Sequence, residues 1–117
     1  MRVSWTFRAA AVLGFFGVVL GAAGAHGLKQ ALSSFDTADI WGTAVFYQLV
    51  HAVALLALAA AGRASQVLAA LWIAGIAIFS GTLYVIALSE LKWLGAVTPI
   101  GGLLLLAGWL LLAIRGR

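Results

Sequence analysis

Residues 9–27 read AAAVLGFFGVVLGAAGAHG, an apolar run in which glycine recurs every three or four residues. Positions three and four residues apart lie on one face of a helix, so these glycines form a stripe. In a membrane, such a stripe lets the backbone of a second helix approach closely. We therefore expect this helix to lie at the packed centre of a membrane bundle. The stripe comprises Gly14, Gly17, Gly21, Gly24 and Gly27.

The composition of the whole chain indicates the same class of protein. Its 117 residues are 65% hydrophobic and 9% charged, with a mean hydropathy of +1.15, so polar side chains are too few to cover a soluble globule. The chain has no cysteine, which excludes disulfides and thiolate metal sites. Its few basic residues do not form the face that nucleic-acid binding requires, so nucleic acid is not an expected partner.

Four apolar segments are long enough to cross a bilayer, which needs about 20 residues per helix. The short polar turn at Arg63 favours antiparallel neighbours. The predicted fold class is all-α, an integral membrane four-helix bundle. Residues 1–117 form one domain, with predicted spans at about residues 8–26, 41–62, 67–88 and 98–114.

The segment between the first two spans predicts a short interfacial helix, because Leu28, Leu32 and Phe35 share one face. A polar loop with a few apolar residues is an equal alternative. Asp36 is predicted to cap the second span, with Asp39 in its first turn.

The fourth span is predicted to begin at Thr98 as the cap, with Pro99 in the first turn, where proline's missing amide hydrogen is not needed.

Basic residues divide unequally between the two ends of the predicted spans. By the positive-inside rule, the arginine-rich end lies in the cytoplasm, and with it both termini of an inner-membrane protein. That end carries Arg2, Arg8, Arg63, Arg115 and Arg117, whereas Lys29 and Lys92 share the other end with Asp36, Asp39 and Glu90. The tryptophans are predicted to lie at the interfaces, with Trp5, Trp72 and Trp109 at the inner one and Trp41 and Trp93 at the outer one.

Four strings, one in each span and in order along the chain, resemble a known family. They are GAAGAHGL from Gly21, YQLVHA from Tyr47, FSGTLYVIAL from Phe79 and VTPIGGLLLLAGW from Val97. They are similar to the small four-span family called domain of unknown function 423, the transmembrane protein 256 family. The resemblance implies a membrane protein of four helices. It supplies no catalytic residue, substrate or cofactor.

Polar side chains gather in the outer half of the predicted bundle. Tyr47 and His51 share a helix face, and His51 lies about 15 Å below the outer end of its span at 1.5 Å per residue. The hypothesis is a hydrogen-bonded cluster or a small cavity open to the outer face. Such a cluster either holds the helices together or forms a ligand or proton site. Its predicted members are His26, Tyr47, Gln48, His51, Ser80, Thr82, Tyr84 and Thr98.

Glycines in the later spans extend the predicted packing positions, some of which could face a partner subunit. A homo-oligomer or a subunit of a larger membrane complex is therefore expected within the lipid bilayer. The predicted helix-packing glycines are Gly14, Gly17, Gly21, Gly24, Gly81, Gly101, Gly102 and Gly108.

The same residues argue against catalysis and metal binding. His26 and His51 are about 15 Å apart in depth, too far to share an ion, and Ser80 has no evident base. We expect no metal, no cofactor and no catalytic residue, and hence no enzyme. The expected function is a structural or accessory membrane component. The alternative is an oligomeric small-solute or proton pathway through the cluster around His51.

Overall fold

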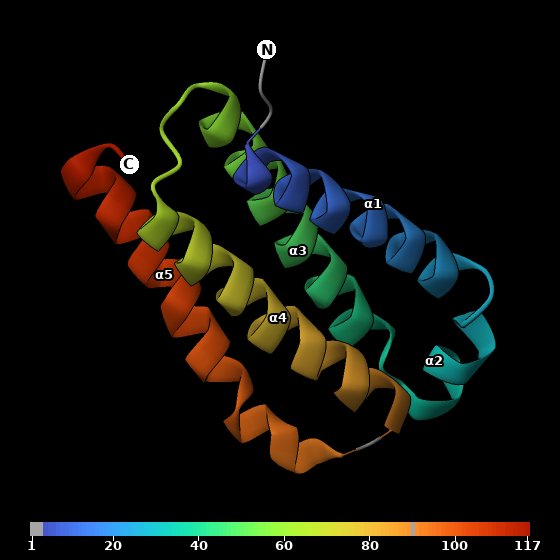
Figure 1. Cartoon of the computed structure of the whole chain (residues 1–117). Helices are drawn as coiled ribbons and strands as arrows, with labels where there is room; N and C mark the ends of the chain where they lie inside the picture. Colours follow the sequence, from blue (N-terminus) through green and yellow to red (C-terminus); the bar gives the residue numbers. More distant parts are fainter. Residues whose placement is uncertain (1–3, 90) are drawn as a thin grey trace.

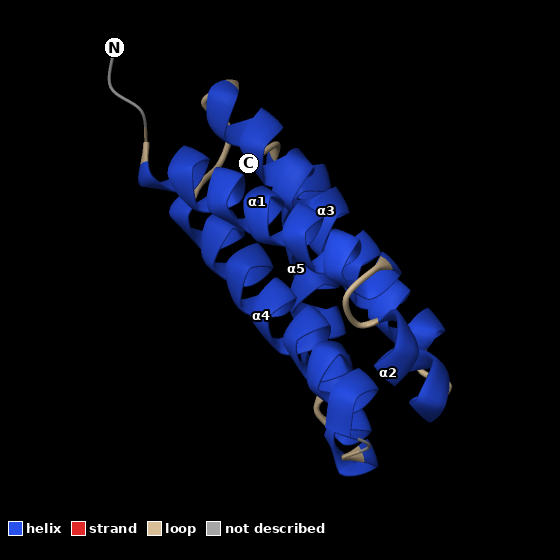
Figure 2. Ribbon diagram, turned by 90° about the vertical axis from the view of Figure 1, so that its right-hand side faces the viewer, coloured by secondary structure: helices blue, strands red, loops and turns tan. Residues whose placement is uncertain are grey.

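The computed structural model describes residues 4–89 and 91–117, so Arg2 and Glu90 of the predicted end assignments lie outside the described residues. Figure 2 shows only helices and loops in this part of the chain. The elements are α1 (Trp5–Ala25), α2 (Lys29–Phe35), α3 (Ala38–Ala60), α4 (Gln66–Ser89), the 3-10 helix η1 (Lys92–Ala96) and α5 (Thr98–Arg115).

Four of the helical segments are long and apolar enough to cross a membrane: Trp5–Ala25, Ala38–Ala60, Gln66–Ser89 and Lys92–Arg115. The protein is thus an all-α integral membrane protein, as predicted. Helix α1 begins three residues before the predicted span, because the Ser4 hydroxyl accepts a hydrogen bond from the Phe7 amide at 3.1 Å and so caps the helix.

The four spans follow the spatial order α1, α3, α4, α5, and each packs mainly on its neighbours in that row (Figure 1). Only 11% of the α1 span is buried, compared with 33% of α4. The prediction that the first helix forms the packed centre was therefore wrong. A glycine stripe indicates close contact with one neighbouring helix. Helix α1 has one neighbour in the row of spans, whereas α3 and α4 each have two.

Two clusters of buried side chains form the core. One surrounds Trp72, which is fully buried among side chains that include Leu55, Leu68 and Leu105. The other contains Trp41, which is 4% exposed. Both indoles are packed in the core between helices, and their predicted depths, Trp41 at the outer interface and Trp72 at the inner one, stay predictions. In contrast, Trp5, Trp93 and Trp109 are 53%, 67% and 42% exposed.

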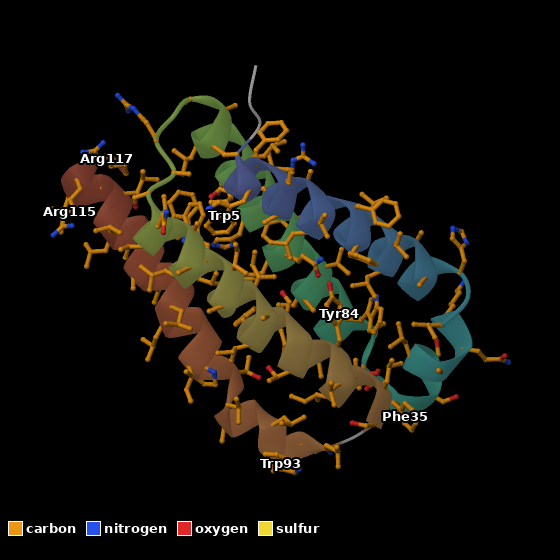
Figure 3. All side chains as sticks on the ribbon, in the orientation of Figure 1. Trp5, Phe35, Tyr84, Trp93, Arg115 and Arg117 are labelled. Atoms are coloured by element: carbon orange, nitrogen blue, oxygen red, sulfur yellow. The ribbon has the colours of Figure 1, made fainter. Side chains whose placement is uncertain are left out.

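The two ends of the molecule differ in charge and shape. Trp5, Arg115 and Arg117 lie at one end, and Phe35 of α2 and Trp93 of η1 lie at the other (Figure 3). The assignment of the arginine-rich end to the cytoplasm stays a prediction, and so does an interfacial location for α2.

The connection between α2 and α3 differs from the prediction. Asp36 has a positive φ of 55° and ends α2, with its amide directed at the carbonyls of Leu32 and Ser33. Aspartate tolerates this left-handed conformation better than most residues. The residue before α3 is Thr37, whose hydroxyl donates to the Ala87 carbonyl at 2.7 Å. Asp36 is therefore not the cap of the second span, although Asp39 does lie in its first turn.

The start of α5 also differs. Pro99 lies in the first turn as predicted, but Val97 is the capping position and makes no side-chain cap bond. Thr98 instead directs its hydroxyl to the Leu94 carbonyl at 3.2 Å and to Thr82. Its predicted capping role was wrong, because two partners outside the α5 backbone engage the hydroxyl.

Candidate functional site

The contact between α1 and α3 is a seam of glycines on one helix and larger side chains on the other. The Trp41 indole lies against Gly24 and donates its Nε1 hydrogen to the Leu20 carbonyl at 2.8 Å. About two turns away, Gly17 faces the side chain of Leu49. Because these glycines lack a Cβ, α3 side chains reach the α1 backbone directly.

The contact between α4 and α5 is closer. Trp72 lies against Gly108 and donates to the Leu105 carbonyl at 3.1 Å. A Cβ at Gly101 would overlap the main chain of Phe79, with 2.8 Å to its Cα. Backbone meets backbone here, which only glycine permits.

The remaining predicted packing glycines differ in their surroundings. A Cβ at Gly21 would lie 3.3 Å from Val45, and one at Gly102 would lie 3.7 Å from the Phe79 ring, an ordinary contact. Gly14 and Gly81 face open space, with no described atom within 4 Å of the added Cβ.

Gln48 joins three helices. Its Nε2 donates to the Leu13 carbonyl of α1 at 2.9 Å, and its Oε1 accepts the Tyr84 hydroxyl of α4 at 2.7 Å. Gln48 itself is 4% exposed. An amide buried in this way satisfies both of its ends and ties α3 to both neighbours.

Two further hydroxyl contacts follow α4. Ser80 is 1% exposed and donates to the Ala44 carbonyl of α3 at 2.8 Å. The hydroxyls of Thr82 and Thr98 lie 2.6 Å apart and join α4 to α5. Polar side chains of α4 thus reach both helices beside it.

His51 connects α3 to α5. Its Nδ1 lies 2.8 Å from the Tyr47 carbonyl, and its Nε2 lies 2.9 Å from the Trp109 indole nitrogen. The tautomer that satisfies both contacts is neutral, with its proton on Nδ1 donated to the carbonyl and Nε2 accepting the indole hydrogen. Sequence reasoning missed Trp109 as this partner because it placed the indole at the inner interface, although a partly buried indole also needs an acceptor.

The predicted polar cluster is thus divided among separate contacts. The described hydrogen bonds do not connect the Gln48–Tyr84 pair to His51, nor either of them to the Thr82–Thr98 pair. His26 is exposed near Lys29 and Gln30 at the surface, away from these contacts. In the described part of the chain, no three His, Cys, Asp or Glu residues group as metal ligands.

A groove of about 530 Å³ runs beside His51, over α4 and between α3 and α5. The Tyr47 ring lies 4.6 Å from that of Phe79 and stacks on His51 at 6.2 Å, measured between ring centroids. The wall of the groove is apolar and aromatic except for groups of Tyr47, His51 and Trp109. Its lining residues are Tyr47, His51, Phe79, Pro99, Gly102, Leu103, Leu105, Leu106 and Trp109.

Comparisons with known proteins agree on one family. A family described as "Protein of unknown function (DUF423)" matches residues 20–102. A UPF0382 membrane protein of Staphylococcus haemolyticus is 43% identical over 80% of each chain. The UPF0382 inner membrane protein YgdD of Escherichia coli is 41% identical over 90% of this chain and 83% of its own. No solved structure matches.

Proposed function

The chain is a multi-pass membrane protein that belongs to the DUF423 family, and on that premise we propose that it is a structural or accessory component of the cell (inner) membrane. It has no enzymatic activity of its own in this proposal. The main support is the use of its buried polar groups: Trp41, Gln48, Trp72 and Ser80 each donate to a main-chain carbonyl of a neighbouring helix. Such bonds hold membrane helices together at about 0.6 to 2 kcal/mol each.

A second observation supports this assignment. Every buried side-chain nitrogen and oxygen among the described residues has a hydrogen-bond partner within the protein. A catalytic group commonly keeps a hydrogen-bonding atom free for its substrate. Buried polar groups that are all hydrogen-bonded within the protein therefore favour a structural role.

The outer face of α1 supports a partner subunit. Phe15 and Val18 are each 63% exposed, and Gly14, about one turn before Val18, faces open space. In this proposal, a second copy of the chain or another membrane subunit packs on that face. The small residue then permits close approach, as at the seams within the chain.

The test is the native mass of the full-length protein in mild detergent. We expect an oligomer or a complex with another subunit, and Gly14→Leu should dissociate it. Gly42→Leu is the matched control, because Gly42 on α3, like Gly14, has no described atom within 4 Å of an added Cβ. A monomer for the unaltered protein, after extraction from its own membrane, would contradict the accessory role.

The alternative is an oligomeric small-solute or proton pathway, which the position of His51 on the groove wall favours. Gln48 and Tyr84, the other groups expected on that pathway, are not among the residues that line the groove. Proteoliposomes with a pH-sensitive dye inside distinguish the two functions. Proton entry that His51→Phe abolishes, with the native mass unchanged, would replace the accessory role by the pathway.

A further inference from the structure

The length of the groove beside His51 corresponds to one leaflet of a bilayer. Its α5 wall runs from Pro99 to Trp109, which is about 15 Å at 1.5 Å per residue. The hydrocarbon core of a bilayer is about 30 Å thick. Pro99 lies in the first turn of α5, next to η1, so the groove begins at the end of the molecule that carries α2 and η1.

The groove is closed at its deep end. The Trp109 indole donates to His51 across the space between α5 and α3, at an N···N distance of 2.9 Å. No residue of α5 beyond Trp109 belongs to the lining. A molecule that enters from the bilayer surface would therefore extend to about the middle of the membrane and stop there.

One polar atom of the lining remains available for a ligand. Tyr47 is 38% exposed, and the hydrogen bonds of the described residues do not include its hydroxyl. Both ring nitrogens of His51 and the indole of Trp109 are already engaged. An unpaired hydroxyl in hydrocarbon is costly, so the position favours a neighbour with a hydrogen-bond acceptor. Tyr47 lies one turn before His51, toward the open end of the groove.

The volume indicates the class of occupant. The groove holds about 530 Å³. It falls within the range of about 300 to 1,000 Å³ typical of small-ligand sites, which are mostly apolar with few polar groups.

We propose that this groove binds one acyl chain of a phospholipid from the leaflet on the α2 side, with the Tyr47 hydroxyl donating to the ester carbonyl. The chain lies along Leu103 and Leu106 and ends at the Trp109–His51 bond. The site goes beyond an accessory role, because it makes the protein a receptor for one lipid molecule at a defined position.

Native mass spectrometry of the delipidated full-length protein, titrated with dioleoyl phosphatidylglycerol, measures this binding. The expected result is one retained lipid per chain. The diether analogue, which lacks the ester carbonyls, should bind about three- to tenfold more weakly, as expected for the loss of one hydrogen bond. Tyr47→Phe should weaken the ester lipid to the same extent and remove the difference between the two lipids.

Filling the groove provides the second test. A Cβ at Gly102 would make only an ordinary contact with Phe79, so the fold can accommodate Gly102→Leu. The leucine side chain would take the space of about two methylene groups of the acyl chain. We expect a loss of affinity of about tenfold or more. Leu106→Trp on the same wall should act in the same direction, whereas Gly42→Leu, outside the lining, should leave binding unchanged.

Two results would overturn the proposal. One is equal lipid retention in the unaltered protein and in whichever of Gly102→Leu and Leu106→Trp keeps its helical circular dichroism. The other is conversion of a dimer into a monomer by these variants without a change in lipid retention, which would assign the groove to a second copy of the chain.

Discussion

The α1·α3 seam and the α4·α5 seam use the same device at opposite ends of the molecule. In each, a buried indole lies against a glycine of the facing helix and donates to a main-chain carbonyl nearby: Trp41 with Gly24, and Trp72 with Gly108. The glycine makes room for the ring, and the carbonyl satisfies the indole hydrogen that would otherwise be unpaired in lipid.

The seams differ in what fills the rest of the contact. Along α1·α3, flexible side chains such as Leu49 and Val45 meet the glycines. Along α4·α5, glycines on both helices bring the backbones together, and a Cβ at Gly101 would also lie 2.9 Å from the Gly75 carbonyl oxygen. A side chain can rotate to accept a methyl group, but two backbones must separate. We therefore expect α4·α5 to be far less tolerant of substitution.

The strongest test of this difference is Gly101→Ala. The added methyl group would overlap Phe79 main-chain atoms, so the two helices must move apart. We expect a loss of about 3 kcal/mol in the free energy of unfolding, the upper part of the range for overpacking. Thermal unfolding in detergent, followed by circular dichroism, measures it. Gly102→Ala is the control, with its added atom in ordinary contact. Similar unfolding of the two variants would contradict a backbone-tight seam.

The two indoles provide the next comparison. Trp72→Phe should cost about 2 kcal/mol and Trp41→Phe about 1 kcal/mol, because each loses a hydrogen bond but only Trp72 is fully enclosed. The Trp72 ring also lies 4.7 Å from Trp109 and 5.3 Å from His51, so a smaller ring disturbs three helices. The free energies of unfolding of both variants are measured under identical conditions. A larger loss for Trp41→Phe would reverse the ranking of the seams.

Much of the fold follows from the sequence, because span length and apolar composition are properties of each segment alone. The order of the helices does not follow in this way. The stripe from Gly17 to Gly24 indicated a close neighbour, but Gly14 continues the same spacing and faces open space. Spacing places residues on one face of a helix, but the extent of the contact depends on how the facing helix crosses it.

The candidate site was less predictable than the fold. Polar residues expected to meet did so only in part: Tyr84 bonds Gln48, and Thr82 lies beside Thr98, but His26 stays at the surface. The missing partners are main-chain carbonyls such as those of Leu13 and Leu20, which every residue carries. Side-chain identity cannot indicate which carbonyl a polar group will reach. Whether the His51 region binds a ligand stays a prediction.

Within the α1·α3 seam, Gly24→Ala should be more harmful than Gly17→Ala. A methyl group at Gly24 meets the Trp41 ring, which is held by its bond to Leu20, whereas one at Gly17 meets a rotatable methyl group of Leu49. We expect a loss of about 1 kcal/mol for Gly24→Ala and a change near zero for Gly17→Ala. Thermal unfolding in detergent, followed by circular dichroism, measures both changes. Equal losses would mean that this seam is as rigid as α4·α5.

The smallest expected loss from removing a hydrogen bond concerns the bond that joins the two seams. The Tyr84 hydroxyl donates to Gln48, which in turn donates to α1, so this pair links α4 to both helices of the other seam. Tyr84→Phe should cost about 0.6 kcal/mol, the average for such bonds in a membrane. Tyr47→Phe is the matched control without lipid present, because the described hydrogen bonds do not include its hydroxyl.

Combined with Gly101→Ala, Tyr84→Phe should give additive losses of unfolding free energy if the seams are independent, since neither residue contacts the other's partners. A combined loss that differs from the sum would show that the tight seam and the adaptable one unfold as a unit.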